Sequence, residues 1–373
     1  MRLNLTSTLD SKDLWINILK TIAIFAVLYL FLVSIGMIGS AFKGFGKGYA
    51  QQLMSSNAGP LIGLFIGILA TSLIQSSSTT TSIVVGMVAA GTFGDSTSVA
   101  VAAAVPYIMG ANIGTSITNT IVSLGHITNK TEFYRAFAAS IVHDFFNIMS
   151  VVILLPLQLY TGFLSKSAVW LAELFIGTET ITFKSPIKMI TKPAVHWIED
   201  FFQQQDIINY NVLLMIFAFI LLFLSLKYLT KLIKSLVIER LEAFFDSHIF
   251  KTALRAMFFG LLITVMVQSS SITTSLIVPM AGAGILSLRQ IFPYSLGTNI
   301  GTTVTAILAS LVSGTLAPVA VAFSHLLFNI CGILIIWLIP IIRNIPIKVD
   351  EWMAGKAVQN RIFPILYIII AFF

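Results

Sequence analysis

Long apolar stretches are the feature that most constrains the fold of this chain. A helix needs about 20 predominantly apolar residues to cross a lipid bilayer. Four stretches are long enough, and they cover Ile16–Gly39, Phe133–Leu157, Ile207–Leu226 and Pro318–Ile342. A further apolar run, Ile362–Phe373, is too short for a full crossing. We therefore expect an all-α polytopic membrane protein.

Composition excludes the main soluble classes. Hydrophobic residues make up 57% of the 373 residues and charged residues only 10%, against about 25% in ordinary soluble domains. A soluble enzyme, a nucleic-acid binder and a disordered chain are thereby excluded. The net charge of +7 fits the enrichment of basic residues in cytoplasmic loops. With one cysteine, Cys331, no intrachain disulfide is possible, and the five scattered histidines predict no metal site and no cofactor.

A second class of apolar stretch is shorter and is interrupted by polar residues. Leu61–Ile74 and Ile83–Ala90 flank the run Gln75-Ser-Ser-Ser-Thr-Thr-Thr-Ser82, and Leu254–Val267 and Leu276–Ile285 flank Gln268-Ser-Ser-Ser-Ile-Thr-Thr-Ser275. Two more motif pairs follow in the same order. They are Gly110-Ala-Asn-Ile-Gly-Thr-Ser116 with Gly297-Thr-Asn-Ile-Gly-Thr-Thr303, and His143-Asp-Phe-Phe-Asn147 with His325-Leu-Leu-Phe-Asn329. Three motifs in register indicate an internal duplication.

Short interrupted segments at matching places in two halves are typical of a transporter's binding site. Each Gln-Ser-Ser-Ser motif carries hydroxyls and an amide that can donate to an anion or coordinate a cation. A helix that restarts after a break presents its positive end to an oxyanion, and a helix that ends presents carbonyls to Na⁺. Serine also favours the N-cap of a restarting helix.

The Gly-x-Asn-Ile-Gly-Thr motifs fit the same pattern. We expect their glycines to permit backbone angles that end a helix, and we expect the residues after them to restart it. Their polar residues are Asn112, Thr115 and Ser116 in the first copy and Asn299, Thr302 and Thr303 in the second. A single polar cluster of this kind would be better interpreted as packing between helices, and only its duplication favours a binding site.

The third motif carries an intramembrane carboxylate. Asp144 lies inside an apolar run, where a charge is costly and by default functional, and Leu326 replaces it in the second copy. His143 and His325 either take part in the site or tie helices together by hydrogen bonds. The repeated motifs contain no Lys or Arg, so a bound multivalent anion needs neutralisation by co-bound cations. This favours coupling to Na⁺.

The paired motifs resemble the type II sodium/phosphate cotransporter family, over about Ala58–Pro156 and Gly260–Pro346. The resemblance implies sodium-coupled import of inorganic phosphate by alternating access, with two inverted-topology repeats, each holding a re-entrant or broken hairpin and a discontinuous helix. It implies phosphate binding by Gln75, Ser76, Ser77, Ser78, Gln268, Ser269, Ser270 and Ser271. It implies Na⁺ binding by Thr79, Asn112, Thr115, Ser116, Asp144, Asn299, Thr302 and Thr303. Members with an Asp at the position of Asp144 are electrogenic, which implies three Na⁺ per divalent phosphate.

The expected organisation has six parts. They are residues 1–57 (an N-terminal segment and first transmembrane helix), 58–160 (repeat 1), 161–206 (an external linker), 207–252 (an inter-repeat helix and cytoplasmic loop), 253–346 (repeat 2) and 347–373 (a C-terminal segment). Six cations within Lys227–Arg255 place that stretch in the cytoplasm, and four place Arg343–Arg361 there. The polar start indicates no signal peptide. The compact linker resembles bacterial members, which favours a bacterial inner membrane.

Three alternatives stay open on the sequence. A symporter of another oxyanion, such as sulfate, a carboxylate or arsenate, needs the same hydroxyls and helix ends. A channel also lines its pore with carbonyls and hydroxyls, although the broken repeats favour a transporter. An intramembrane serine hydrolase is the weakest alternative, because the chain lacks a Gly-x-Ser-x-Gly elbow and duplicated motifs do not suit a single nucleophile.

Overall fold

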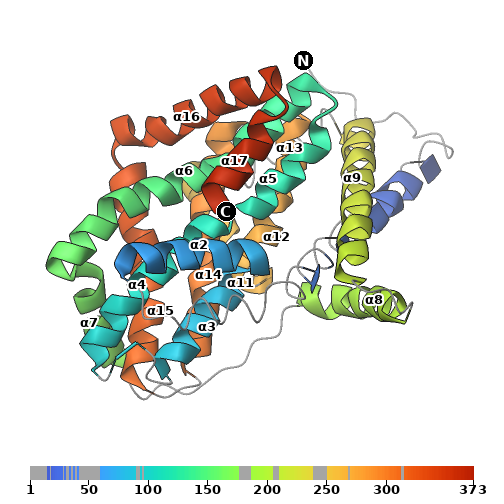
Figure 1. Ribbon diagram of the computed structural model, residues 1–373. Coiled ribbons are helices and arrows are strands. Elements are labelled where there is room, and N and C mark those ends of the chain that lie inside the picture. The colour runs from blue at the N-terminus through green and yellow to red at the C-terminus, as the bar shows by residue number, and fades with distance from the viewer. Residues whose placement is uncertain are drawn as a thin grey trace.

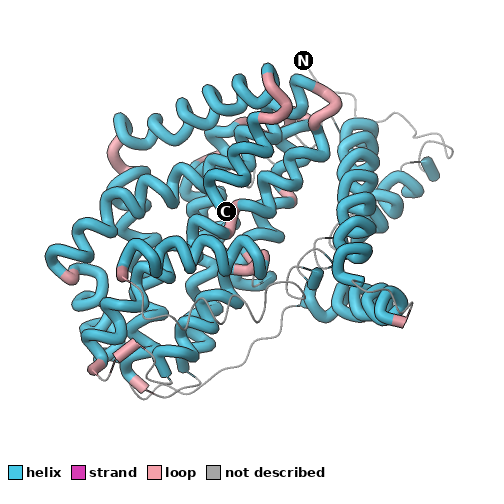
Figure 2. Tube along the Cα trace, in the orientation of Figure 1, coloured by secondary structure: helices cyan, strands magenta, loops and turns pink. Residues whose placement is uncertain are grey.

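The computed structural model describes residues 59–89, 93–94, 96–175, 186–204, 210–237, 250–267, 269–311 and 315–373, together with parts of 15–41. Every regular element in these ranges is a helix (Figures 1 and 2), which confirms the expected all-α class. Within them, three helical stretches are long and apolar enough to cross a membrane: Thr97–His126, Lys130–Thr161 and Leu316–Trp337.

Within the described part of residues 59–161, the chain forms five α-helices and one short 3₁₀ turn. They are α2 (Pro60–Ile74), α3 (Ser77–Ala89), α4 (Thr97–Gly114), α5 (Ile117–Ser123), the 3₁₀ turn η1 (Leu124–His126) and α6 (Lys130–Thr161). Then come α7 (Phe163–Phe175), α8 (Pro186–Gln203) and α9 (Tyr210–Val237), of which α8 and α9 lie at the right of Figure 1. Thus the stretch expected as an external linker contains α7 and α8.

The second half repeats the order of the first. It holds α11 (Ala253–Val267), α12 (Ser270–Ser275), α13 (Ile277–Gly282), α14 (Leu288–Leu311), α15 (Leu316–Gly332) and the π-helical turn η3 (Ile333–Trp337). It closes with α16 (Pro340–Gln359), which lies along the top of Figure 1, and α17 (Phe363–Phe372), which runs from there toward the centre of the view. The short apolar segments expected around both Gln-Ser-Ser-Ser motifs are therefore confirmed as separate helices.

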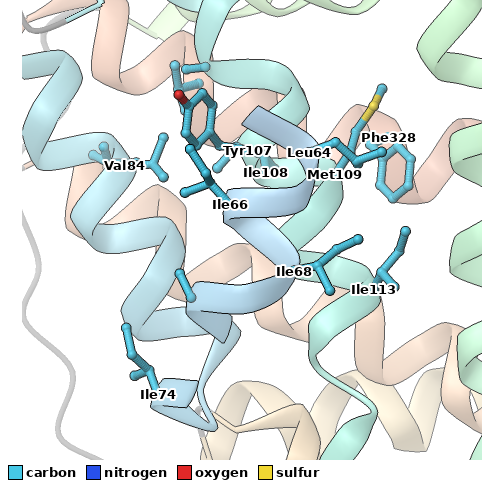
Figure 3. Packing of buried hydrophobic residues seen from close by; sticks show 14 of the residues in the cluster. Leu64, Ile66, Ile68, Ile74, Val84, Tyr107, Ile108, Met109, Ile113 and Phe328 are labelled. Atoms are coloured by element: carbon cyan, nitrogen blue, oxygen red, sulfur yellow. The ribbon is translucent and has the colours of Figure 1, made fainter. Parts of the chain in front are cut away.

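Glycines set how closely the helices of each half approach. In the first half α2 packs on α4, and a Cβ on Gly110 would overlap the carbonyl oxygen of Leu64. In the second half α11 packs on α14 in the same way, because a Cβ on Gly297 would overlap the carbonyl oxygen of Met257. Figure 3 shows side chains of α2, among them Leu64 and Ile68, beside those of α4. The duplication in sequence is thus a duplication in packing.

The role predicted for these glycines was wrong. The described glycines with positive φ are Gly94, Gly162 and Gly284, and none belongs to a Gly-x-Asn-Ile-Gly-Thr motif. The motif glycines serve close contact between helices, which a side chain at that place would prevent. In the first half the predicted break is present as a short turn: α4 ends at Gly114 and α5 begins at Ile117, while Thr115 and Ser116 between them keep helical φ and ψ.

The corresponding break in the second half is absent. The helix α14 runs without interruption from Leu288 to Leu311 and so passes through Gly301, Thr302 and Thr303. No glycine of this helix has positive φ, so nothing turns the backbone out of the helix there. Only the first copy of the motif therefore forms a discontinuous helix, and the two halves differ at this point.

Candidate functional site

The first Gln-Ser-Ser-Ser motif lies at a true helix break. Gln75 ends α2 with φ 57°, the one described non-glycine residue with positive φ. Its backbone N–H still donates to the Thr71 carbonyl at 2.8 Å, and its side-chain amide donates to the Ser72 carbonyl at 2.8 Å. Its side-chain oxygen accepts from the Thr118 hydroxyl at 2.5 Å. The Gln75 side chain thus joins the break to α5.

The serines after Gln75 start the next helix. The Ser76 hydroxyl accepts from the backbone N–H of Thr79 at 3.2 Å and from the Thr79 hydroxyl at 2.9 Å, as an N-cap does. Ser77 and Ser78 follow in the first turn of α3 and are buried. The positive end of the α3 dipole therefore lies at a cluster of buried hydroxyls.

The second motif has the same design. Its Gln268 lies outside the described residues. The Ser269 hydroxyl accepts from the backbone N–H of Ile272 at 3.4 Å and caps α12, with Ser269 itself extended at φ −153°. Ser270 and Ser271 are buried, and the Ser271 hydroxyl donates to the Thr115 carbonyl at 3.3 Å. Both serine caps confirm the predicted restarts.

The two motifs converge on one short segment, Thr115–Asn119, at the break between α4 and α5. Thr118 donates to Gln75 of the first motif, and the Thr115 carbonyl accepts from Ser271 of the second. The Asn119 side-chain oxygen accepts from the Thr274 hydroxyl at 2.9 Å and from the Ser275 hydroxyl at 3.1 Å. Residues 156 positions apart in the chain are thereby brought into contact.

Thr118 and Asn119 were missed by the sequence analysis. The signal was present as a polar run, because Thr115, Ser116, Thr118, Asn119 and Thr120 continue the motif beyond Gly114. All five side chains are buried. Asn119 is also where the copies differ, since Ala306 stands at the matching position of the second half.

The four hydroxyls predicted to bind Na⁺ at the Gly-x-Asn-Ile-Gly-Thr motifs all donate to carbonyls of their own helix. The acceptors are Ala111 for Thr115 (2.9 Å), Ile113 for Ser116 (3.0 Å), Thr298 for Thr302 (3.0 Å) and Ile300 for Thr303 (2.7 Å). With its hydrogen donated, each oxygen presents lone pairs. Such oxygens suit a cation better than an anion.

The predicted asparagines lie in a reciprocal network between the two halves. The Asn112 side-chain oxygen pairs with His325 Nε2 at 3.2 Å, and the Asn299 side-chain oxygen pairs with His143 Nε2. Asn147 Nδ2 donates to the Asn112 carbonyl at 2.8 Å, while Asn299 Nδ2 donates to the Asn147 side-chain oxygen at 3.0 Å. Each half thus contributes an asparagine that a histidine of the other half holds, which supports the interpretation that the histidines tie helices together.

Asp144 is fully buried on α6 and is contacted by the C-terminal helix. The Tyr367 hydroxyl of α17 donates to Asp144 Oδ2 at 2.5 Å, and the Ser116 side chain also faces this carboxyl. The Tyr367 ring packs near Phe137 and Phe145 of α6. Among the described residues, Asp144 forms no ion pair with Lys or Arg. A negative charge on Asp144 would therefore need another partner.

A second buried carboxylate, Asp350 of α16, was also missed. The four cations of Arg343–Arg361 predict a cytoplasmic position for its surroundings. Asp350 is nevertheless fully buried, and both of its carboxylate oxygens lack a hydrogen-bond partner among the residues that the structure describes. No local pattern distinguishes a buried Asp from an exposed one, so only the packing of α16 on α6 reveals it.

Comparison with known proteins identifies the family of this chain. Residues 30–182 and 221–333 match the profile of the family described as Na⁺/Pi-cotransporter. The chain is similar to the human sodium-dependent phosphate transport protein 2B, with 32% identity over 95% of this chain and 64% of that protein. It is similar to the sheep sodium-dependent phosphate transport protein 2A, with 33% identity over 96% of this chain and 66% of that protein. The chain thus spans about two thirds of these relatives' length. No solved structure matches it.

Proposed function

This chain belongs to the Na⁺/Pi-cotransporter family, and on that basis we propose that it imports inorganic phosphate by electrogenic coupling to Na⁺. Its relatives are named for sodium-dependent phosphate transport. The observation that carries the proposal is the convergence of both Gln-Ser-Ser-Ser motifs on Thr115–Asn119. A transporter, rather than an enzyme, accounts for two matching motifs that meet at one place.

Phosphate would bind among the hydroxyls and amides at this convergence. The proposed residues are Gln75, Ser76, Ser77, Ser78, Gln268, Ser269, Ser270 and Ser271, to which we add Thr118 and Asn119 as positioning residues. The hydroxyls can turn their hydrogens toward an oxyanion, and the α3 dipole favours negative charge at its start. With no Lys or Arg in the motifs, phosphate binding depends on bound Na⁺.

Na⁺ would bind to oxygens around the α4–α5 break and at Asp144. Candidate ligands are Thr79, Asn112, Thr115, Ser116, Asp144, Asn299, Thr302 and Thr303. The carbonyls that a broken helix leaves without intrahelical donors add further oxygens. An anionic Asp144 would bind one additional Na⁺, whose charge the phosphate does not balance. This additional ion is the basis of the proposed net charge movement.

The transport cycle we propose is alternating access between two inverted repeats, in a bacterial inner membrane. The reciprocal asparagine–histidine contacts support two related halves that meet at one interface. In such a cycle the halves move against one another while the shared site changes its side of exposure.

The test is uptake of radiolabelled phosphate into proteoliposomes under an inward Na⁺ gradient, with and without an inside-negative voltage. We expect uptake that requires Na⁺ and becomes faster with the voltage. Absence of Na⁺-dependent uptake by folded protein would remove phosphate as the substrate, and competition by sulfate, arsenate and carboxylates would then identify the oxyanion.

The electrogenic part has its own variant. Asp144→Gly should reduce the charge carried per phosphate, because the variant loses the one anionic residue of the repeated motifs. The control is Glu173→Gln, which removes an exposed carboxylate of α7. Unchanged current per phosphate in Asp144→Gly would contradict the role of Asp144 and leave phosphate import standing.

A further inference from the structure

Asp350 has an environment that disfavours a free negative charge. Its side chain is fully buried on α16, and no described residue forms a hydrogen bond with either carboxylate oxygen. No Lys or Arg in the described part of the chain pairs with it. A carboxylate moved from water into a protein interior loses several kcal/mol of hydration, by order of magnitude, unless a partner replaces it. Either a proton or a bound cation therefore neutralises Asp350.

Asp350 lies near Asp144 and Tyr367. Burial, the charge of Asp144 and the charge of Glu351, in that order, raise the pKa of Asp350 well above its usual range. The Tyr367 hydroxyl donates to Asp144 Oδ2 and lies close enough to Asp144 and Asp350 to interact electrostatically with both carboxylates. Asp144 Oδ1, like both oxygens of Asp350, lacks a hydrogen-bond partner. Three unpartnered carboxylate oxygens thus belong to one small region between α6, α16 and α17.

The donor set indicates the kind of ion. The described residues contain no group of three His, Cys, Asp or Glu side chains suited to a metal ion, so a transition-metal site is not indicated. Carboxylate and hydroxyl oxygens are hard ligands, and here they come from two carboxylates, the Tyr367 hydroxyl and the nearby Ser116 hydroxyl. Because only the two carboxylates among these ligands can carry negative charge, the site favours a weakly held monovalent cation.

We propose that Asp350 of α16 and Tyr367 of α17 complete, together with Asp144 of α6, a Na⁺ site. The site rests on the proposed function in taking Na⁺ as the coupling ion. It extends that function by giving Asp144 a second carboxylate partner, on an element outside both repeated motif sets. The helices α16 and α17 would then carry part of the coupling machinery.

The experiment measures ²²Na⁺ binding to the purified full-length chain without phosphate. Asp350→Asn should weaken Na⁺ binding by about tenfold or more, the range typical when a metal site loses a supporting oxygen group. The matched control is Glu351→Gln, which removes the neighbouring but exposed carboxylate and should leave the affinity within about twofold. Equal Na⁺ affinity in wild type and Asp350→Asn would overturn the proposal.

A stability measurement separates a site from a structural role. We expect Na⁺, compared with choline, to raise the Tm of the wild type, because a ligand that binds the folded state stabilises it. In Asp350→Asn this increment should disappear, while the Tm in choline stays equal or rises, since a buried unpaired charge is removed. A lower Tm in choline with the full Na⁺ increment retained would overturn the proposal.

A third variant does not depend on the folding of Asp350→Asn. Tyr367→Phe keeps the ring that packs near Phe137 and Phe145 and removes only the hydroxyl. It should also weaken ²²Na⁺ binding, and unchanged binding would contradict a site that includes Tyr367. Since no measurement here involves phosphate, a protein that binds Na⁺ at this site but fails to take up phosphate would contradict the proposed function alone.

Discussion

At the scale of the residue, polar side chains inside this protein are arranged by hydrogen bonds to neighbouring helices. Gln75 occupies a left-handed conformation that costs a non-glycine residue free energy, and its side chain is held at both ends, by Ser72 and by Thr118. Local rules anticipated the break and its serine caps, because both depend on sequence neighbours. They could not anticipate Thr118, which is 43 positions away.

Thr118→Val tests the positioning of Gln75. Valine has the shape of threonine but leaves the Gln75 side-chain oxygen without its donor, at a cost of about 1–3 kcal/mol. We expect the apparent affinity for phosphate to fall by at least about fivefold, which corresponds to about 1 kcal/mol. The measurement is the phosphate KM of uptake at saturating Na⁺.

The matched control for this variant is Thr71→Val. The Thr71 hydroxyl is buried but has no hydrogen-bond partner, so its removal breaks no contact of this kind. We expect transport in Thr71→Val to equal that of the wild type. If both variants change the KM by the same factor, the Thr118–Gln75 contact has no special role.

At the scale of the element, the helix pairs α2–α4 and α11–α14 are the repeated building block. Each pair approaches so closely that a glycine of one helix lies against a carbonyl of the other. In a membrane, where apolar surface is abundant everywhere, such close contact drives helix association. The motif is interrupted between α4 and α5 in the first half but is continuous within α14 in the second. Similar local sequences thus adopt different backbone conformations in the two halves.

Gly110→Ala tests this packing. The added Cβ would overlap the Leu64 carbonyl, which belongs to helix backbone and has little room to move. We expect a loss of stability of about 3 kcal/mol, visible as a lower Tm in detergent. Gly355→Ala in α16 is the control, because nothing lies within 4 Å of its Cβ position. That change should be neutral or slightly stabilising, as alanine favours helix more than glycine. Equal Tm values for the two variants would refute the packing argument.

At the scale of the whole molecule, the two halves are interlocked rather than placed side by side. Asn112 is held by His325, and Asn299 by His143, so each motif is completed by the other half. The convergence on Thr115–Asn119 adds contacts from Gln75, at the end of α2, and from α12 to the same region. In a site that both halves share, the binding of one ligand can change the affinity for another.

Linkage between Na⁺ and phosphate follows at this scale. If Na⁺ neutralises a phosphate site that lacks basic residues, raising Na⁺ must lower the phosphate Kd, and raising phosphate must lower the Na⁺ Kd by the same factor. Isothermal titration of each ligand at several fixed concentrations of the other measures both factors. A phosphate Kd independent of Na⁺ would exclude this form of coupling.

The sequence by itself determined the helical membrane class, the positions of the interrupted segments and the duplicated motifs. These features are local or periodic, because apolar length, serine caps and repeated spacing depend only on neighbouring residues. The ends of α2 and α11 at Ile74 and Val267 agree with the sequence-based boundaries for this reason.

Only the tertiary structure decided which distant residues meet. The contact of Asn119 with Thr274 and Ser275, the burial of Asp350 and the capping of Asp144 by Tyr367 all join segments far apart in the chain. The local sequence also did not reveal that α14 is continuous at a motif that is interrupted between α4 and α5. Burial and pairing depend on what packs against a residue, and a polar side chain does not encode its partner.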